Sequence, residues 1–148
     1  MSDSDSLLFE RDTCSALVIT CSDFRFKSCE QAFARKAGLQ NDYDLIARPG
    51  AIRSLVLPRN AVARESMEEE IRVLWRLHRF TRVLMLQHLS CRAYDDIASA
   101  ENEREVHAAH LAAAAPIVEK LLEGVTAEPY IVGMVRGTLT VSREIARP

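Results

Sequence analysis

The stretch Leu17-Val18-Ile19-Thr20-Cys21-Ser22-Asp23-Phe24-Arg25 decides the fold. Its first half is an apolar, β-branched run that is typical of a buried strand in a parallel sheet. Cys21, Asp23 and Arg25 then follow at every second position. If the chain stays extended through Arg25, these three side chains share one face, because side chains alternate along a strand. Proteins of the α/β class place their chemistry at this end of a strand, which predicts a functional site. The alternative is a free cysteine followed by an aspartate that caps the next helix.

Strand-like segments recur along the chain and alternate with helical ones. The first strand is predicted at about 14–21, and three more at 43–47, 82–87 and 130–135. A tight turn at Arg136-Gly137 leads into 138–145, where apolar and polar residues alternate as in an antiparallel edge strand. The pattern predicts an α/β fold, with a central, mainly parallel sheet of four strands, an antiparallel fifth edge strand and helices on both faces.

Capping residues and apolar periodicity place the helices between these strands. Ser28 with Gln31 has the pattern of a capping box, which predicts a helix from there to about residue 37. Ser66 with Glu69 predicts the start of a second helix, whereas 52–65 shows no clear pattern. An Ala-rich third helix is predicted at 101–115, and Pro116 either kinks it or begins another helix.

Length and composition indicate one domain, 1–148, with residues 1–11 as a flexible N-terminal arm whose Leu7, Leu8 and Phe9 could dock on a surface. Nineteen Lys and Arg against 21 Asp and Glu give a net charge of −2, which offers no electrostatic case for nucleic acid. The polar N-terminus lacks the pattern of a signal peptide, and no apolar run is long enough to span a membrane. We therefore expect a cytoplasmic protein whose four cysteines serve metal binding or catalysis rather than disulfides.

The ends of two predicted strands carry the residue types that bind zinc. Cys21 ends the first strand, and His88-Leu89-Ser90-Cys91 follows the strand at 82–87. Adjacent parallel strands would bring these ends together. Two thiolates and one imidazole suit zinc and leave its fourth position open, as in catalytic zinc sites, where the pKa of bound water falls to about 7. Asp23 would be the fourth ligand or accept the proton of the water, and Arg25 would hold Asp23 by a bidentate pair.

The other cysteines and histidines have less specific interpretations. Cys29 is interpreted as a structural residue in the first turn of its helix. His78, at the end of the second predicted helix, is interpreted as a partner of the helix dipole. His107 and His110 share a helix face and could bind a metal together. We interpret them as surface histidines, because no third ligand lies near them in the sequence.

Together these motifs resemble the β-class carbonic anhydrases, and the resemblance runs in register through most of the chain. Residues 21–25 look like the family's Cys-x-Asp-x-Arg motif, and 88–91 match its His-x-x-Cys. Arg48-Pro49-Gly50-Ala51 falls where the family has Arg-Asn-Ala-Gly, and Ser66-Met67-Glu68 where a helix begins Ser-Leu-Glu. Residues 131–137 look like the family's last hairpin. The resemblance implies the strand order 2-1-3-4 for the four parallel strands.

The resemblance also implies an activity and roles for the residues. It makes Cys21, His88 and Cys91 zinc ligands, with Asp23 and Arg25 as the catalytic dyad. The family hydrates carbon dioxide to bicarbonate and is built from dimers with active sites near the subunit interface, so a homodimer or higher oligomer is expected. The substrate pocket is predicted to include Phe24, Arg48, Gly50, Ala51 and Arg92.

Two departures from the family pattern leave alternatives open. Arg92 stands where the family usually has Gly after the second Cys, and this long cation could fill the pocket or attract an anion. Pro49 replaces the family's Asn and has no N–H to donate. The leading hypothesis is a zinc enzyme that hydrates carbon dioxide. The alternatives are a zinc-binding homologue that acts on another small electrophile, such as a carbon–sulfur compound, and a non-enzymatic binding or regulatory protein.

Overall fold

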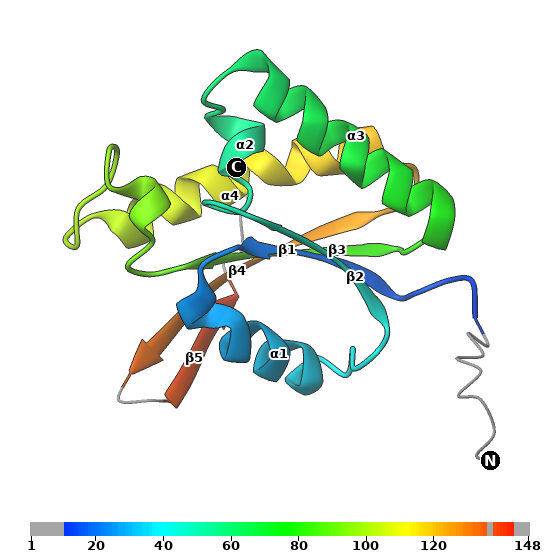
Figure 1. Ribbon diagram of the computed structural model, residues 1–148, viewed down its shortest axis with the longest axis horizontal. Coiled ribbons are helices and arrows are strands. Elements are labelled where there is room, and N and C mark those ends of the chain that lie inside the picture. Colours follow the sequence, from blue (N-terminus) through cyan, green and yellow to red (C-terminus); the bar gives the residue numbers. More distant parts are fainter. Residues whose placement is uncertain (1–10, 136–137, 144–148) are drawn as a thin grey trace, which may run out of the picture.

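The computed structural model describes residues 11–135 and 138–143, which form a five-stranded sheet with helices on both faces (Figure 1). The predicted arm at Leu7, Leu8 and Phe9 lies outside the described residues. The strands are β1 (Ala16–Cys21), β2 (Tyr43–Arg48), β3 (Arg82–His88), β4 (Thr126–Val135) and β5 (Thr138–Arg143). The helices are α1 (Lys27–Lys36), α2 (Arg53–Val56), α3 (Ala61–His78) and α4 (Glu103–Leu121), with short 3-10 turns η1 (Phe24–Phe26) and η2 (Arg92–Tyr94).

The sheet has the order β2-β1-β3-β4-β5. The first four strands are mutually parallel, and β5 runs antiparallel to β4 at one edge. This arrangement confirms the predicted α/β fold, the order 2-1-3-4 and the antiparallel edge strand. Because β1 and β3 are neighbours in the middle of the sheet, their carboxyl ends lie side by side, and the loops that follow them meet at one edge.

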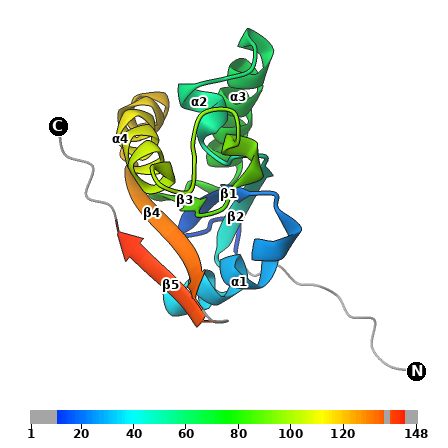
Figure 2. The same cartoon turned by 90° about the vertical axis from the view of Figure 1, so that its left-hand side faces the viewer.

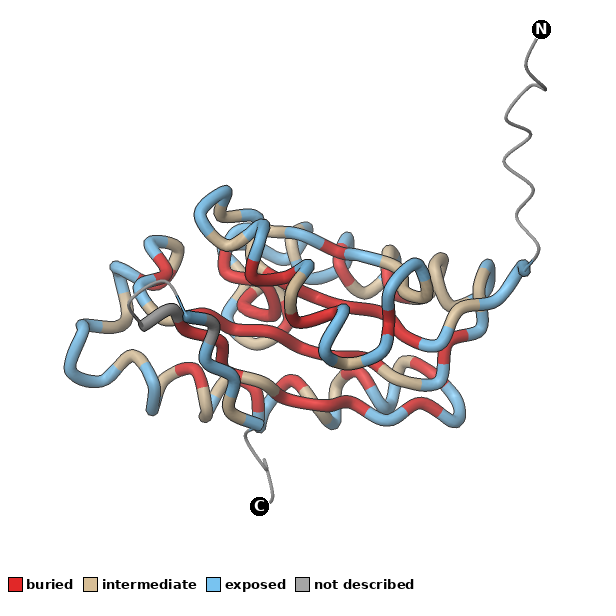
Figure 3. The backbone as a smooth tube through the Cα atoms, turned by 90° about the horizontal axis from the view of Figure 1, so that it is seen from below, coloured by how far each residue is buried: buried red, intermediate tan, exposed pale blue. Residues whose placement is uncertain are grey.

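Successive side chains of the central strands point to opposite faces of the sheet, and this divides the core into two apolar layers. Leu17 and Ile19 of β1 belong to the layer beneath α2, α3 and α4, whereas Ala16 and Val18 belong to the layer against α1. Turned by 90°, the molecule shows α1 on one side of the sheet and the other three helices opposite (Figure 2). The buried residues follow the strands of the middle layer (Figure 3). Because both faces of these strands are buried, the sequence shows continuous apolar runs.

The helix boundaries differ from the predictions in two places. α3 begins at Ala61, and Asn60 caps it by accepting a hydrogen bond from the N–H of Ala63 at 2.9 Å, so the capping box predicted at Ser66 was wrong. α1 begins at Lys27 without a side-chain cap, so the capping box at Ser28 was also wrong. The η1 turn leads directly into α1, which removes the need for such a cap.

Prolines lie inside two regular elements. α4 continues through Pro116 as one helix. β4 begins at Thr126, four residues before its predicted start, and contains Pro129. β3 pairs with the whole of 126–132, but β5 pairs with β4 only from Tyr130 onward. Among the described residues, Pro129 therefore lies where β4 has no partner on its second side, which is where a strand tolerates the missing N–H.

None of the helices in the described part of the chain is long and apolar enough to cross a membrane.

Candidate metal centre

Cys21, His88 and Cys91 converge at the carboxyl ends of β1 and β3. Cys21 is the last residue of β1 and His88 the last of β3. Ser90 adopts a left-handed conformation with φ of 59°, and this turn brings Cys91 back to the strand ends. One ligand atom from each of the three residues lies within 4.8 Å of the other two. The structure therefore brings together the three residues that the sequence predicted as ligands.

The two sulfur atoms have the spacing of a zinc thiolate pair. The Sγ atoms of Cys21 and Cys91 are 3.9 Å apart, and both cysteines are free. Two sulfurs that each lie ~2.3 Å from a tetrahedral zinc are about 3.8 Å apart. The hydrogen bond from Cys91 lowers the pKa of Cys21, and the same interaction, with burial, raises the pKa of Cys91.

His88 presents a free nitrogen to these sulfurs. Its Nδ1 donates a hydrogen bond to the carbonyl oxygen of Leu89 at 2.8 Å, which leaves the lone pair on Nε2. Phe26 stacks on the imidazole with the ring centroids 3.9 Å apart and holds its orientation. Nε2 is buried and has no hydrogen-bond partner among the described residues. A buried acceptor without a partner costs free energy unless it binds something, and a metal ion satisfies it.

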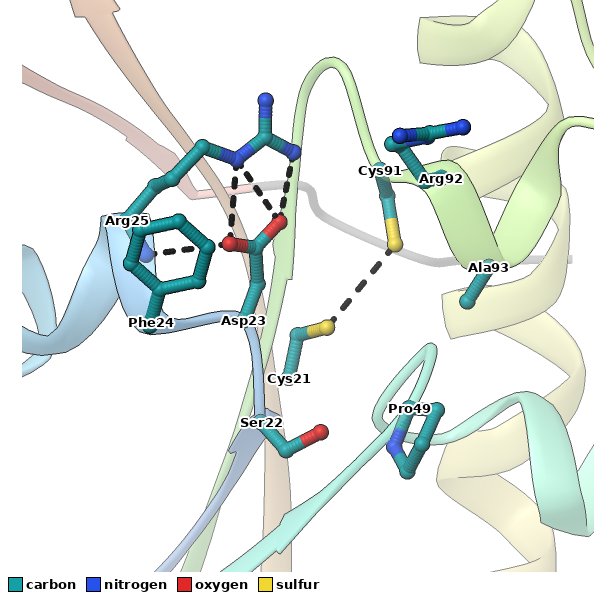
Figure 4. Close-up of a pocket in the computed structure, with 9 residues that line it drawn as sticks. All are labelled: Cys21, Ser22, Asp23, Phe24, Arg25, Pro49, Cys91, Arg92 and Ala93. Atoms are coloured by element: carbon teal, nitrogen blue, oxygen red, sulfur yellow. Dashed lines mark hydrogen bonds and ion pairs between the residues drawn. The ribbon is translucent and has the colours of Figure 1, made fainter.

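Asp23 and Arg25 form a bidentate ion pair beside the ligands, in which Nε donates to Oδ1 and Nη2 to Oδ2 (Figure 4). The chain does not stay extended through Arg25, which was the condition for Cys21, Asp23 and Arg25 to share one face. Asp23 instead caps η1 by accepting the N–H of Arg25 at 3.0 Å. Asp23 therefore caps a turn and also reaches the site. Its Oδ2 lies 2.5 Å from Nη2 of Arg25 and 3.9 Å from Nε2 of His88. The hydrogen bond from the Arg25 guanidinium is the main reason why the pKa of Asp23 is lowered to about 2.

A pocket of about 470 Å³ opens over this cluster. Phe24 lies at its rim with a relative exposure of 87%. Arg92 lies on the opposite wall; its side chain is 85% exposed and approaches the carboxylate of Asp95 at 3.6 Å. The residues that line the pocket are Cys21, Ser22, Asp23, Phe24, Arg25, Pro49, Cys91, Arg92 and Ala93 (Figure 4). The thiols are thus reachable by a small molecule from solvent.

Comparison with known proteins agrees with this geometry. Residues 11–136 match the family described as "Putative carbonic anhydrase". The chain belongs to this family. Two uncharacterised proteins are similar to this carbonic anhydrase-like chain over 126 residues, which are 81% of this chain in each case. The protein from Rickettsia bellii is 27% identical, and the match covers 77% of its length. The protein from Rickettsia conorii is 26% identical, and the match covers 68% of its length. The resemblance to carbonic anhydrases inferred from the strand-end motifs is therefore confirmed.

A solved structure shares the fold of this carbonic anhydrase-like chain. The β-carbonic anhydrase CafA of Aspergillus fumigatus superimposes with a TM-score of 0.54 at 18% sequence identity, over 96% of this chain and 80% of that one. At this identity the likeness establishes the fold. The five-stranded order, with its antiparallel edge strand, is thus the architecture of a β-carbonic anhydrase.

The turn after β2 supports the metal centre with its backbone. Gly50, at φ of 75°, donates its N–H to Sγ of Cys21 at 3.4 Å. A Cβ at this position would lie 3.2 Å from Cβ of Arg53, so glycine suits both the conformation and the space. Gly50 and two other residues predicted in the pocket, Ala51 and Arg48, are not among the residues that line it. Ala51 is fully buried, and Arg48 turns to Glu70 of α3 at 2.5 Å.

Arg53 is a supporting residue that the sequence predictions missed. Its guanidinium is buried and donates hydrogen bonds to the carboxylate of Asp96 at 2.6 and 2.8 Å and to the carbonyl oxygen of Ala93. It also lies over the ring of Tyr94, 5.6 Å from the centroid. These contacts attach the chain that follows Cys91 to α2. The residue lies in 52–65, where the sequence showed no periodicity.

A buried polar network lies behind the metal centre, and it corrects the prediction for two histidines. Gln87 donates to the hydroxyl of Tyr94 at 2.7 Å and lies 3.3 Å from Nδ1 of His107. The Tyr94 hydroxyl lies 3.0 Å from Nδ1 of His110. His107 is buried, and burial lowers its pKa to about 4. The prediction of surface histidines was wrong for His107, because α4 turns this face onto the sheet.

Proposed function

We propose that this protein is a zinc-dependent carbonic anhydrase, a lyase that reversibly hydrates carbon dioxide to bicarbonate. The observation that carries the proposal is the buried Nε2 of His88, which has no hydrogen-bond partner among the described residues and lies beside two thiols 3.9 Å apart. This donor set is that of an open zinc site with three protein ligands. Membership in the carbonic anhydrase family and the β-carbonic anhydrase fold support the reaction type.

Each residue of the proposed site has a chemical role. Cys21, His88 and Cys91 would hold the metal, and zinc bound there would supply a hydroxide nucleophile at neutral pH. Asp23 would accept a hydrogen bond from the attacking group and orient it, since its carboxylate is ionised and lies 3.9 Å from His88. Arg25 would hold Asp23 in place through two parallel hydrogen bonds, from Nε to Oδ1 and from Nη2 to Oδ2.

The pocket walls suit a small apolar substrate and an anionic product. Phe24 and Pro49 supply apolar surface beside the thiols. Arg92 sits at the mouth, where its charge would attract bicarbonate in the reverse reaction without blocking the sulfur atoms.

The test combines metal analysis and a stopped-flow carbon dioxide hydration assay on the same sample. We expect at least one zinc per chain and hydration that depends on it, because removing the zinc with a chelator removes the nucleophile. Re-addition of zinc should restore the rate, and addition of magnesium, which prefers oxygen ligands, should not. A fully zinc-loaded protein with no hydration above the buffer rate would refute the proposal.

A second candidate function has a specific observation in its favour. Pro49 and Arg92, the two departures from the family pattern, both line the pocket. A proline with no N–H and a nearby cation would change how a substrate is hydrogen-bonded. The alternative is a zinc-binding homologue that acts on another small electrophile, or that binds an anion without turning it over. Full zinc occupancy with anion binding but no hydration would favour it.

We propose that the protein forms a homodimer that covers the pocket rim. Phe24 is 87% exposed beside the pocket, and the outer edge of β2 has no partner strand within the part of the chain that the structure describes. Light scattering at micromolar concentration should give twice the chain mass of 16.6 kDa. Phe24→Ser should shift the mass towards the monomer, whereas Val62→Ser, a change at another exposed apolar residue, should not. A wild-type mass near 16.6 kDa would contradict the proposal.

A further inference from the structure

We propose that Cys14, Asp44 and His78 form a second divalent-metal site. It lies at the amino ends of β1 and β2, whereas the candidate metal centre lies at the carboxyl ends of β1 and β3. One ligand atom from each residue lies within 4.8 Å of the other two. The three come from different parts of the chain: Cys14 precedes β1, Asp44 lies in β2, and His78 is the last residue of α3. They offer one sulfur, one oxygen and one nitrogen, which are the three donor types that zinc binds.

The fold holds these residues together through the backbone. The N–H of Cys14 donates to the carbonyl oxygen of His78 at 3.1 Å, which fixes the start of β1 to the end of α3. In Figure 1 the beginning of β1 and the end of α3 lie at the same end of the molecule. Asp44 pairs in register with Leu17 and lies two residues before Ile46 in β2. Leu17 and Ile46 both belong to the apolar layer beneath α3. Strand alternation therefore turns Asp44 towards His78.

The site is partly buried but open to solvent. The side chain of Asp44 is mostly buried, and that of His78 is 40% exposed. Nδ1 of His78 lies 2.7 Å from Oδ2 of Asp44, so an ordinary hydrogen bond accounts for two of the three residues. It does not account for Cys14, whose thiol donates to the carbonyl oxygen of Ala16 at 3.4 Å. A metal ion would use all three side chains, and water could complete a tetrahedron.

The charges at the site favour a dication. A Cys14 thiolate and the Asp44 carboxylate would together neutralise two positive charges, and Asp42 adds negative charge near the thiol. Two nitrogen or oxygen ligands ~2.0 Å from a tetrahedral metal are about 3.3 Å apart, so His78 and Asp44 need to separate by only about 0.6 Å. Burial and the carboxylate of Asp44 raise the pKa of Cys14, so the metal must displace a proton. That requirement selects a thiophilic ion such as zinc over magnesium.

The two sites can be tested separately. Cys14 precedes β1 and Cys21 ends it, seven residues further on, which corresponds to about 23 Å of extended chain. The second site therefore does not depend on the proposed function.

The experiment uses cobalt(II) as a coloured probe for zinc. In the double variant Cys21→Ser/Cys91→Ser, the candidate metal centre has lost both thiolates. We expect this variant to bind one equivalent of cobalt with a sulfur-to-cobalt charge-transfer band. Adding Cys14→Ser should abolish the band. Adding His78→Gln should weaken cobalt binding by at least about tenfold, since even outer residues of metal sites cost that much.

Cys29→Ser in the same background is the matched control, because Cys29 is free but lies in the layer against α1. It should leave the band unchanged. Wild-type protein should bind two equivalents of zinc, and Cys14→Ser should bind one while keeping its carbon dioxide hydration rate. Absence of the band in the double variant, or its persistence after Cys14→Ser in a protein with unchanged circular dichroism, would overturn the proposal.

Discussion

Cys91→Ser should remove most of the zinc from the candidate metal centre and abolish the metal-dependent hydration of carbon dioxide. A neutral hydroxyl is a poor replacement for a thiolate, and the thiolate is the form of cysteine that binds metal. Cys21 and His88 remain in place, because β1 and β3 hold them, but two ligands leave zinc readily exchangeable. We expect zinc affinity to fall by far more than the ~10–100-fold that loss of an outer residue costs. Competition with a chromophoric chelator measures this loss.

The control for this prediction is Cys29→Ser. Cys29 is as buried as Cys91 but packs on Phe33 and Ala34 in the layer against α1. This variant should lose some stability, because a hydroxyl replaces a thiol in an apolar layer, yet keep its zinc and its hydration rate. Full occupancy of the candidate metal centre in Cys91→Ser would remove Cys91 from the site.

The strands and the metal cluster could be predicted because each depends on short-range pattern. β1 and β3 are buried on both faces, so their apolar runs stand out in the sequence, and their last residues, Cys21 and His88, are adjacent to the positions where the runs end. Parallel neighbours align their carboxyl ends, and this rule placed Cys91 near Cys21 although 70 residues separate them. The antiparallel fifth strand was visible in the alternation of its residues.

The supporting residues could not be predicted because their roles depend on long-range contacts. Arg53 reaches across 43 residues to Asp96, and a charged residue in an aperiodic segment gives no sign of burial. His107 is buried because α4 packs this face on the sheet, and its hydrogen-bond partner Gln87 is a polar residue inside an apolar strand. The start of α3 at Ala61 was missed because Asn60 alone caps it, without a second residue to complete a pattern.

Arg25→Ala should keep the zinc but close the site to water, with loss of hydration by at least about 100-fold, the scale on which proton-transfer groups act. The two oxygens of Asp23 are held differently. Oδ1 accepts Nε of the guanidinium at 3.0 Å, but it also accepts the backbone N–H of Arg25 at 3.0 Å, which any residue with a backbone N–H at this position retains. Oδ2 is held by the guanidinium at 2.5 and 3.1 Å. The change therefore frees Oδ2, and this is the oxygen that lies 3.9 Å from Nε2 of His88.

A freed carboxylate oxygen beside zinc would take the open fourth position, because removal of the guanidinium removes the group that competes for it. Zinc content should stay intact, since Cys21, His88 and Cys91 are unchanged.

Arg25→Lys should rescue only part of the activity, because an ammonium lacks the planar fork that holds both the carboxylate and the carbonyl oxygen of Ser90. Asp23→Ala separates the two effects: it should also retain zinc and lose activity, but small anions should bind more readily because no carboxylate competes. Crystal structures of the zinc-loaded wild type and of Arg25→Ala would show which group occupies the fourth position of the zinc. Water still in that position in the variant would rule out this role for Arg25, even if the activity of the variant fell.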